Sequence, residues 1–589
     1  MKKGVLVLFG LCLCALPVLG VVLLDFETLP SLDADGTGAK FSLSNAWSSG
    51  GKSSLQIVPS GQAEETKLSF LLSGDGLASF REAQTLVLDL HVSSDSSPVP
   101  TTFFLGMADI TNGWQWVDGI FSPEQGKAGT LCVRFFLPEK LLRVKTTGKY
   151  RLYLAFFNSD ASGAKIPLQH PFWIDEIRLE GIEKEQEESN MEGATTNQSI
   201  QTLLQLGDEA LLEEIQRRTF LYFWEEANPE NGLVRDRSTV TSPCSIAAVG
   251  FALAAIPVGI EHGWIDPEQG LQRVLTTLRT FAGGNVEGRN GFFYHFVSLF
   301  SGERVGRSEL SSIDTTLLLA GAMVAAGYFQ GTEVEQLTRQ LLSQVDWHWM
   351  RNGKETLSMG WHPETGFIDA HWNAFNEGLL AYTLAIGSLT DPLDPSAWDA
   401  IERPRKGTFI SLPEETLFVY QYPQVFVDYR NKRDAYTNYF ENAVIASRYN
   451  RQFTRSRRAQ YATYDESVWG LSASDGPYGY RAYGASERNH DGTIAPHGSI
   501  GSIVFTPEES MECIRAMLQT YGDRVWGKYG FVSAINAEQN WYSEQFIGID
   551  QGLILLMIEN YRTGKVWEWF GKNPEVQRWL DAVGFVDQP

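Results

Sequence analysis

The pattern of hydrophobic and polar positions divides the chain into two regions with different periods. Between about residues 22 and 182, short runs rich in β-branched and aromatic residues, such as 85–91, 131–136 and 150–156, are separated by Gly, Ser, Asn and Asp. From about residue 202 onward, apolar residues instead recur at three- and four-residue steps. The first pattern predicts a β-sandwich with tight turns, and the second predicts α-helices.

The helical pattern continues to the end of the chain. Its further apolar stretches are punctuated by Pro and Gly and cover residues 246–256, 271–281, 312–329, 334–345, 376–386, 507–520 and 551–561. No alternation of strands and helices is evident, which disfavours doubly wound and TIM-barrel architectures. The connections are long, aromatic and acidic, whereas helices in simple bundles are usually joined by about 2–8 residues. We therefore expect a closed, all-α toroid of helical hairpins after the sandwich.

A polar segment joins the two regions, and an apolar leader precedes them. Residues 183–201 are rich in Glu, Asn and Thr, which is the composition of a solvated linker. Lys2 and Lys3 precede an apolar run with cleavage expected near Gly20, the pattern of a signal peptide. The expected organisation is therefore a signal peptide (1–21), a β-sandwich (22–182), a linker (183–201) and a helical domain (202–589).

The leader predicts a secreted or periplasmic protein. Because the apolar stretch up to Leu24 is nearly long enough to cross a bilayer, retention of the leader as a cell-surface anchor is the alternative. The net charge of −23 argues against nucleic acid as a partner, since phosphate binding needs clustered Lys and Arg. The 17 Trp residues are numerous, and indole faces can stack on sugar rings, although core packing also uses them.

Several common catalytic motifs are missing from the sequence. It has no Gly-rich phosphate loop, no Gly-x-Ser-x-Gly elbow, no Cys-x-x-Cys pair and no His-Glu-x-x-His. We therefore expect a site built from carboxylates that needs no cofactor for catalysis. Glu309 and Asp314 lie just before an apolar helix, where Asp314 could instead be a helix cap.

Glu377 is the other carboxylate with unusual surroundings. It opens an apolar run directly after an acidic, aromatic segment that contains Trp361, His362, Asp369, His371 and Trp372. A first-turn glutamate is also favoured by the helix dipole, which is the purely structural interpretation. In an apolar pocket, however, its pKa would rise, as a general acid requires. Trp361 and Trp372 are expected to include at least one sugar-stacking platform, with the neighbouring polar groups on its hydroxyls.

A run of motifs in the helical region carries a family resemblance. The motifs, in chain order, are 218–220, 222–224, 232–237, 312–321, 376–378, 470–476, 491–496, 549–552 and 558–564. From about residue 205 to 589 the chain resembles the glucoamylase-like domain of glycoside hydrolase family 144, the bacterial endo-β-1,2-glucanases. The resemblance implies an (α/α)6 barrel that cleaves β-1,2-glucan to short gluco-oligosaccharides with inversion at the anomeric carbon.

The resemblance also implies roles for individual residues. Glu377 would be the general acid, and the general base would be Asp314, Glu309 or, as a weaker candidate, Asp491. In the inverting geometry, one acid protonates the glycosidic oxygen and another carboxylate activates water. The residues expected to bind the glucan substrate are Arg235, Asp236, Trp361, His362, Asp369, His371, Trp372 and Asp491.

The N-terminal region resembles jelly-roll carbohydrate-binding modules of the galactose-binding-like kind. The resemblance rests on residues 24–27, 51–55 and 172–179. It implies a structural Ca²⁺ held by Asp25, Glu27 and Asp175, because a hard cation prefers carboxylate and carbonyl oxygens. Ordinary surface carboxylates are the alternative interpretation.

Two further functions remain open at this stage. The same acids could hydrolyse an α-glucan or another β-glucan, because a carboxylate pair serves every linkage. The chain could also be a catalytically inactive, sugar-binding surface protein, although its set of acids argues against this. A terpene-cyclase-like toroid would need an Asp-rich ionisation motif, and none is evident.

Overall fold

The structure of the protein is a computed structural model that describes most of the helical region and the strands of the β-rich region. The described residues are 21–24, 39–44, 53–63, 65–72, 77, 79–81, 83, 85–93, 100, 102–111, 115–122, 129–137, 141, 149–159, 165–180, 200–239 and 241–588. The chain forms two compact units, Met1–Gly193 and Ala194–Pro589. The predicted signal peptide, apart from Val21, and nearly all of the predicted linker lie outside the described residues.

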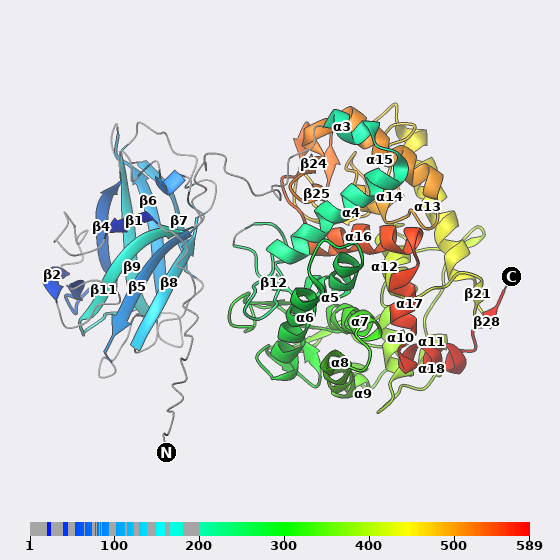
Figure 1. Ribbon diagram of the computed structural model, residues 1–589, viewed down its shortest axis with the longest axis horizontal. Coiled ribbons are helices and arrows are strands. Elements are labelled where there is room, and N and C mark those ends of the chain that lie inside the picture. Colours follow the sequence, from blue (N-terminus) through cyan, green and yellow to red (C-terminus); the bar gives the residue numbers. More distant parts are fainter. Residues whose placement is uncertain are drawn as a thin grey trace, which may run out of the picture. The chain divides into compact units, whose positions relative to one another are not determined.

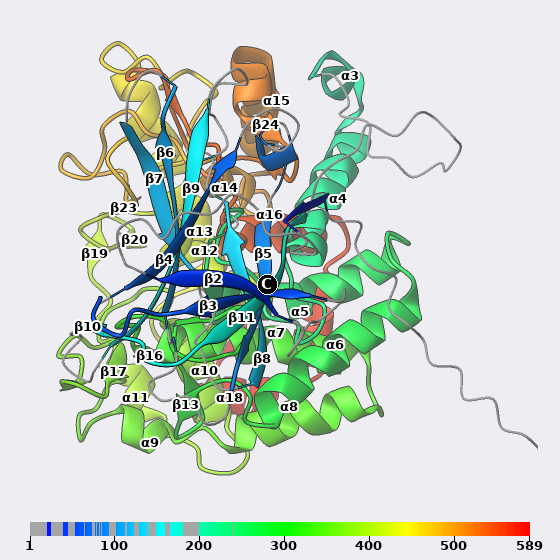
Figure 2. The same ribbon diagram turned by 90° about the vertical axis from the view of Figure 1, so that its left-hand side faces the viewer.

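The N-terminal unit contains two antiparallel sheets (Figures 1 and 2). One has the order β2-β3-β11-β5-β8, with β1 also paired to β11, and the other has the order β10-β9-β6-β7, with β4 also paired to β9. The strands are β1 (Val21–Leu24), β2 (Lys40–Ser44), β3 (Ser54–Val58), β4 (Thr66–Leu72), β5 (Thr85–Val92), β6 (Thr102–Asp109), β7 (Gln115–Phe121), β8 (Gly129–Phe136), β9 (Tyr150–Ser159), β10 (Lys165–Ile166) and β11 (Phe172–Glu180).

Alternation along the strands gives this unit its core. In β5, Leu86, Leu88 and Leu90 are fully buried because residues two apart lie on the same face of a strand. They join a hydrophobic cluster with residues of β6 and β9, such as Leu105 and Leu154. The predicted β-sandwich is confirmed, and its sheets fit the jelly-roll module expected from the sequence.

The C-terminal unit is an α/α toroid with an inner ring of helices (Figure 1). The inner helices are α5 (Ile246–Glu261), α7 (Ser312–Tyr328), α10 (Leu379–Gly387), α12 (Phe418–Phe426), α14 (Pro496–Ile500) and α16 (Gly548–Arg562). Successive members pack on one another, and α16 closes the ring on α5. Gln421 of α12 reaches across to α14, where its Nε2 donates a 2.7 Å hydrogen bond to the Gly498 carbonyl. The predicted all-helical toroid is confirmed.

The inner helices are apolar nearly all round, which is typical of helices buried on every side. α5 and α7 come so close that a Cβ on Gly321 would lie 1.8 Å from the Gly250 carbonyl oxygen. A Cβ on Gly250 would likewise lie 2.2 Å from the Leu317 carbonyl oxygen. These two glycines therefore set the distance between the helices that carry two sides of the candidate site.

Amphipathic helices form the outer layer. They are α4 (Asp208–Glu225), α6 (Pro267–Ala282), α8 (Glu333–Ser343), α13 (Tyr439–Arg457) and α15 (Pro507–Tyr521). Between α10 and α12 the chain makes only the one-turn helix α11 (Ser396–Asp399), and the C-terminal helix α18 (Pro574–Val583) packs on α10 instead. α18 thus occupies the place of the sixth outer helix. The remaining helices are α3 (Ile200–Gln205), α9 (Trp347–Met350), α17 (Lys565–Gly571) and the 3-10 turn η1 (Gly522–Arg524).

The connections differ in length at the two ends of the toroid. Those that lead into inner helices are long and contain short hairpins, as in 283–311 and 458–495. Those that lead out of inner helices are short, as in 262–266 and 329–332. The N-terminal ends of the inner helices therefore carry nearly all of the irregular chain, which is where functional side chains are commonly placed.

The short hairpins of these connections are β12 (Cys244–Ser245) with β15 (Phe296–Val297), β13 (Gly288–Arg289) with β14 (Phe292–Phe293), β16 (Leu310–Ser311) with β17 (Gly360–His362) and β18 (Gly366–Phe367), β19 (Arg405–Lys406) with β20 (Phe409–Ile410), β22 (Ala473–Ser474) with β23 (Arg481–Ala482), β24 (Trp526–Gly527) with β25 (Gly530–Phe531) and β26 (Ile535–Asn536) with β27 (Trp541–Tyr542). β21 (Lys432–Arg433) pairs with the last strand, β28 (Val586–Asp587).

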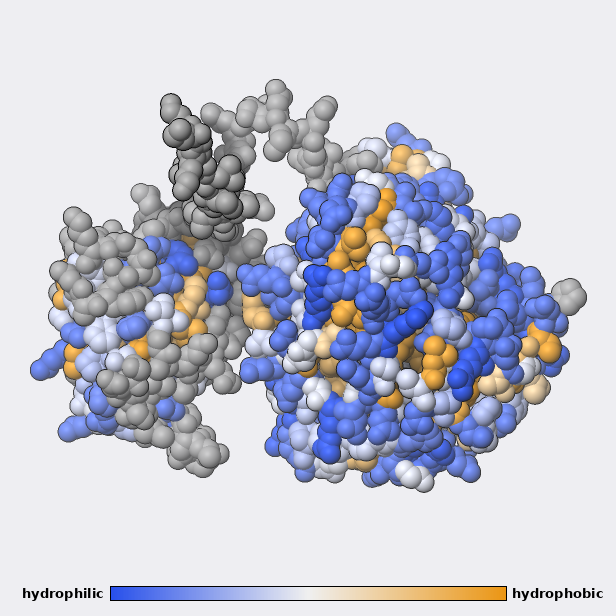
Figure 3. Space-filling view, turned by 60° about the horizontal axis from the view of Figure 1, so that its bottom comes forward, coloured by the Kyte–Doolittle hydropathy of each residue, from blue (hydrophilic) through white to orange (hydrophobic). Residues whose placement is uncertain are grey.

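Polar residues dominate the face of the C-terminal unit that Figure 3 shows, and hydrophobic residues appear there in small, separate groups. Among the helices that the structure describes, none has the length and apolar character needed to cross a membrane.

Candidate active site

Carboxylates gather at the N-terminal ends of the inner helices. Asp314 lies in the first turn of α7, Glu377 lies just before α10, and Asp550 lies in the first turn of α16. Asp236 and Asp475 come from the connections that precede α5 and α14. The charges of these groups act on one another: Asp550 raises the pKa of both Asp236 and Asp475, after the larger effect of burial. Five segments far apart in the sequence thus build one acidic cluster.

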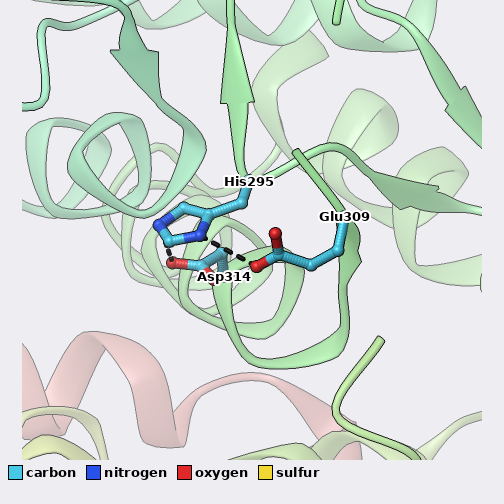
Figure 4. Close-up of side chains that lie close together, drawn as sticks. All are labelled: His295, Glu309 and Asp314. Atoms are coloured by element: carbon cyan, nitrogen blue, oxygen red, sulfur yellow. Dashed lines mark hydrogen bonds and ion pairs between the residues drawn. The ribbon is translucent and has the colours of Figure 1, made fainter. Parts of the chain in front are cut away.

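A histidine lies between two of the predicted acids (Figure 4). His295 Nδ1 is 3.0 Å from Glu309 Oε1, and Nε2 is 3.5 Å from Asp314 Oδ1. Burial disfavours the charged imidazolium, but the carboxylates of Asp314, Glu309 and Asp236 outweigh it and raise the pKa of His295 to about 9. His295 is therefore a cation at neutral pH, clamped between two carboxylates.

Asp314 has a structural contact as well. Ser311 caps α7 by accepting a hydrogen bond from the Asp314 backbone N–H at 3.1 Å, and its hydroxyl donates to Asp314 Oδ2 at 2.5 Å. One hydroxyl thus both caps the helix and donates to the carboxylate of Asp314. The cap itself is Ser311, so the carboxylate of Asp314 keeps a second oxygen directed at His295.

Burial changes the proton affinity of Glu377. Removal from water is the largest effect on this carboxyl, its own backbone N–H opposes that effect, and the charge of Asp314 adds to it, so the pKa rises to about 7. Glu377 lies in a tight turn. In this turn, Asn376 Oδ1 accepts a 2.9 Å hydrogen bond from the backbone N–H of Gly378. At neutral pH, Glu377 is thus poised to hold or release a proton.

Trp372 packs against this turn from the core side, and its ring is not a surface on which a sugar stacks. It is only 6% exposed, and its Nε1–H donates a 2.8 Å hydrogen bond to Ser312 Oγ. A Cβ on Gly378 would lie 2.8 Å from the indole ring, so the turn rests directly on it. The stacking role predicted for Trp372 is wrong because this ring belongs to the toroid core.

Arg237 connects two members of the acidic cluster. Its Nε donates a 3.1 Å hydrogen bond to Asp236 Oδ2, and its Nη1 lies 3.3 Å from both carboxylate oxygens of Asp475. The neighbouring Arg235, which was expected to bind substrate, instead pairs through Nε with Glu226 at 3.1 Å. Asp236 is therefore a cluster residue, whereas Arg235 braces the connection that carries it.

Asp550 is the most deeply buried acid of the cluster. It is 1% exposed, and Ser533 donates a 2.8 Å hydrogen bond to its Oδ2. Its Oδ1 lies 3.4 Å from Nδ1 of the equally buried His497. Tyr480, at the tip of the β22–β23 hairpin, is 51% exposed, but burial of its hydroxyl end and the charge of Asp550 raise its pKa. The β22–β23 hairpin therefore places the Tyr480 side chain beside the acidic cluster.

The remaining predicted substrate residues lie in less direct positions. Trp361 is half-buried in β17, with the Arg289 guanidinium 4.7 Å from its ring centre. His362 is half-buried beside it, and Asp369 is exposed. His371 is buried, and its Nδ1 donates a 2.8 Å hydrogen bond to the Thr356 carbonyl, so its role is structural.

Asp491 has a structural role in its connection. Its Oδ1 accepts a 3.0 Å hydrogen bond from the Thr493 backbone N–H, and its Oδ2 accepts one of 3.3 Å from the Tyr483 hydroxyl. Both oxygens are therefore engaged in holding the loop before α14. These contacts argue against the expectation that Asp491 serves as the base.

Metal ligation has one candidate among the residues that the structure describes. Donor atoms of His295, Glu309 and Asp314 lie within 4.8 Å of one another. The two carboxylates contact opposite nitrogens of the same ring, so the imidazolium already offsets one of their two negative charges. For the calcium site expected in the sandwich, Asp25 and Glu27 lie outside the described residues, and Asp175 is a buried residue of β11.

Sequence reasoning missed five residues of this cluster: Arg237, His295, Asp475, Tyr480 and Asp550. Two weak signals existed. Asp475 and Tyr480 lie in the long Gly- and Tyr-rich segment before α14, and Arg237, Asp475 and Asp550 lie inside the motifs 232–237, 470–476 and 549–552 that carry the family resemblance. His295 lies in none of these motifs, and only the fold brings it to the carboxylates.

The toroid and its carboxylate cluster define the class of α/α-toroid glycoside hydrolases. A family model described as putative glucoamylase matches residues 369–574. The chain belongs to this glucoamylase-like family, as predicted. It is 31% identical to a putative glucoamylase from Bacteroides uniformis, whose crystal structure has a TM-score of 0.62 over 65% of this chain and 98% of that one.

Two further relatives have named activities. The exo β-1,2-glucooligosaccharide sophorohydrolase (non-reducing end) of Parabacteroides distasonis is 30% identical over 425 residues, which cover 65% of this chain. The chain spans 59% of the length of that relative. An endo-β-1,2-glucanase from Chitinophaga pinensis, solved with sophorotriose and glucose, is 27% identical, with a TM-score of 0.59 over 65% of this chain and 99% of that one.

Proposed function

We propose that the chain is a secreted glycoside hydrolase that cleaves β-1,2-glucan to short gluco-oligosaccharides with inversion. The observation that carries this proposal is Glu377, a buried carboxyl with a pKa of about 7 that faces the charge of Asp314. Two carboxyl groups with different proton affinities are what acid–base cleavage of a glycosidic bond needs. The choice of the β-1,2 linkage follows the names of the two relatives.

In the proposed reaction, Glu377 is the general acid. Its proton passes to the glycosidic oxygen as the bond from that oxygen to the anomeric carbon breaks. Asp314 is the general base, because its charge acts on Glu377 and its Oδ1 lies 3.5 Å from Nε2 of the protonated His295. It takes a proton from the attacking water, whose oxygen joins the anomeric carbon from the opposite face, which inverts the configuration.

His295 is a positioning residue in this scheme. Burial would raise the pKa of Glu309, but the hydrogen bond and charge of the protonated His295 lower it overall, and the same imidazolium places a positive charge 3.5 Å from the Asp314 carboxylate. Asp314 in turn raises the pKa of Glu377 and keeps the acid protonated. The three side chains thus separate the two catalytic proton affinities.

We expect His295→Gln to lower kcat/KM by about 10- to 100-fold, since a hydrogen bond to a charged group contributes about 1.5–3 kcal/mol. Glutamine keeps a polar group but removes the positive charge, so Glu309 binds a proton more readily and Asp314 loses its cationic neighbour. The acidic limb of the pH profile of kcat/KM should therefore move to higher pH. His362→Gln, at a half-buried neighbour, is the matched control and should leave that limb in place. An equal loss at every pH would contradict the positioning role.

The activity itself is tested by incubating the purified chain with linear β-1,2-glucan and a panel of other linkages. We expect new reducing ends and short oligosaccharides from β-1,2-glucan alone, with the α-anomer formed first. Cleavage of an α-glucan or another β-glucan instead would retain the hydrolase and overturn the linkage. Binding of glucan without any cleavage would favour the inactive sugar-binding alternative.

Three further parts of the proposal have separate supports. Secretion rests on the N-terminal leader, which lies outside the described residues. Catalysis without a cofactor rests on a carboxylate pair that completes the proton transfers by itself. A structural Ca²⁺ in the sandwich rests on Asp25, Glu27 and Asp175, and chelation should lower the melting temperature of that unit if the ion is present.

A further inference from the structure

A recess lies in the outer wall of the toroid, away from the acidic cluster. Its volume is about 500 Å³, within the range of small-ligand pockets. It lies where α18 replaces the missing outer helix and leaves a gap beside α8, above the C-terminal end of α10. Glu377 lies at the other end of α10, and nine helical residues separate the two by about 14 Å.

A buried carboxyl group marks this recess. Glu575, in the first turn of α18, lines it and is only 5% exposed. A Cβ on Gly387 would lie 2.2 Å from the Glu575 carbonyl oxygen, so the end of α10 holds this turn tightly in place. Burial raises the pKa of Glu575, its own backbone N–H opposes that effect, and Arg339 acts on it only through its charge.

The Glu575 carboxyl lacks a side-chain partner within the described part of the chain. No side chain of residues 200–239 or 241–588 donates a hydrogen bond to it. The carboxyl group bonds to its own backbone N–H and lines the recess, so its oxygens are not orphaned. It can still accept a hydrogen bond from a ligand that enters the recess, since a carboxylate offers about four acceptor sites.

The other walls of the recess indicate the kind of ligand. Leu384 and Trp347 give an apolar floor, while Gln336, Ser343 and Thr390 add amide and hydroxyl groups that can both donate and accept. A cation is disfavoured by the positive charge of Arg339, which also lines the recess. An anion is disfavoured by Glu575 itself. A neutral ligand with hydroxyl groups around an apolar face fits these walls, and a pyranose ring has this character.

We propose that the recess between α8 and α18 is a second carbohydrate-binding site, which takes a glucosyl unit of a neutral glucan through Glu575. Only the choice of glucose as the sugar rests on the proposed function. The site would hold part of a polymeric substrate on the outer wall while another part reaches the acidic cluster. Because the recess is open on one side, it takes a unit of a chain as well as a free sugar.

The test measures binding and not cleavage, so it is independent of the proposed reaction. The full chain carrying Glu377→Gln is titrated with sophorose by calorimetry, and hydrogen exchange is followed by mass spectrometry. We expect protection of residues 384–390 and 574–580 on adding the sugar. We expect Thr390→Trp, at the exposed rim, to remove that protection and one class of binding sites. Glu575→Gln should weaken binding at this site at least tenfold.

The matched control is Gln577→Trp, which adds the same indole to an exposed position of α18 that does not line the recess. It should leave both the protection and the number of sites unchanged. Melting temperatures of all variants show whether the unit stays folded. Unchanged titrations with Thr390→Trp, or no protection of either segment at millimolar sophorose, would overturn the proposal. Protection of the recess together with a wild-type chain that cleaves no glucan would overturn only the proposed reaction.

Discussion

Replacement of Glu377 by Gln is expected to lower kcat by about 10²–10⁴-fold and to leave the fold intact. The amide has nearly the same shape as the acid but cannot give a proton to the leaving oxygen. The wild-type protein should lose activity as the pH rises above about 7, since Glu377 then releases its proton. Initial rates on β-1,2-glucan across pH, for both proteins, measure the two effects.

Glu364→Gln is the matched control for this substitution. Glu364 lies in the same connection but is exposed and paired with Arg304, so its loss should leave kcat within about twofold. Its pKa is lowered to about 2, chiefly by the hydrogen bond from Arg304. A Glu377→Gln protein with nearly full activity would show that Glu377 only begins α10, and another carboxyl of the cluster would have to be the acid.

Trp372→Ala is expected to lower the free energy of unfolding by about 3–5 kcal/mol, the cost of deleting a buried Trp from a core. Two effects contribute to this loss of stability. The substitution leaves a cavity beside the Gly378 turn, and Ser312 loses the hydrogen bond that the indole Nε1–H donates. Chemical denaturation followed by tryptophan fluorescence measures the change. Activity should fall together with the folded fraction, because the turn that carries Glu377 rests on this ring.

Trp361→Ala provides the contrast. The ring of Trp361 is half-buried at the edge of β17, so its loss should cost less stability and act more on substrate affinity. If Trp372→Ala unfolded at the wild-type denaturant concentration while its KM rose, Trp372 would contact sugar after all. Trp372→Phe, which keeps most of the volume but loses the Nε1 donor, separates packing from hydrogen bonding.

Much of the fold could be predicted from hydrophobic periodicity. The helix expected at 312–329 occurs at Ser312–Tyr328, and the strand expected at 85–91 occurs at Thr85–Val92. The helices that were missed have a physical reason in common. α12 contains Pro423, α14 has only five residues, and the polar α13 has Arg at four of its nineteen positions. Local periodicity is weak in such segments, and tertiary packing decides their structure.

Some residues of the candidate site could likewise be predicted from the sequence, and others could not. Glu377 and Asp314 could be found because each precedes an apolar helix of clear period. Trp372 was misinterpreted because an aromatic ring beside acids has the same local sequence in a cleft and in a core. His295 lies in the connection between α6 and α7 and reaches Asp314 only when this connection folds back onto the start of α7, so no spacing in the sequence could indicate it.

The C-terminal helix α18 bears on how the protein is made. Because it packs on α10, nearly two hundred residues earlier in the chain, the outer layer of the toroid stays incomplete beside α10 until α18 has been synthesised. Contacts between such distant segments form late and slowly. Nascent chains would expose the wall of α10 until then, and a chain that ended before α18 would leave this wall uncovered, however complete its set of catalytic residues.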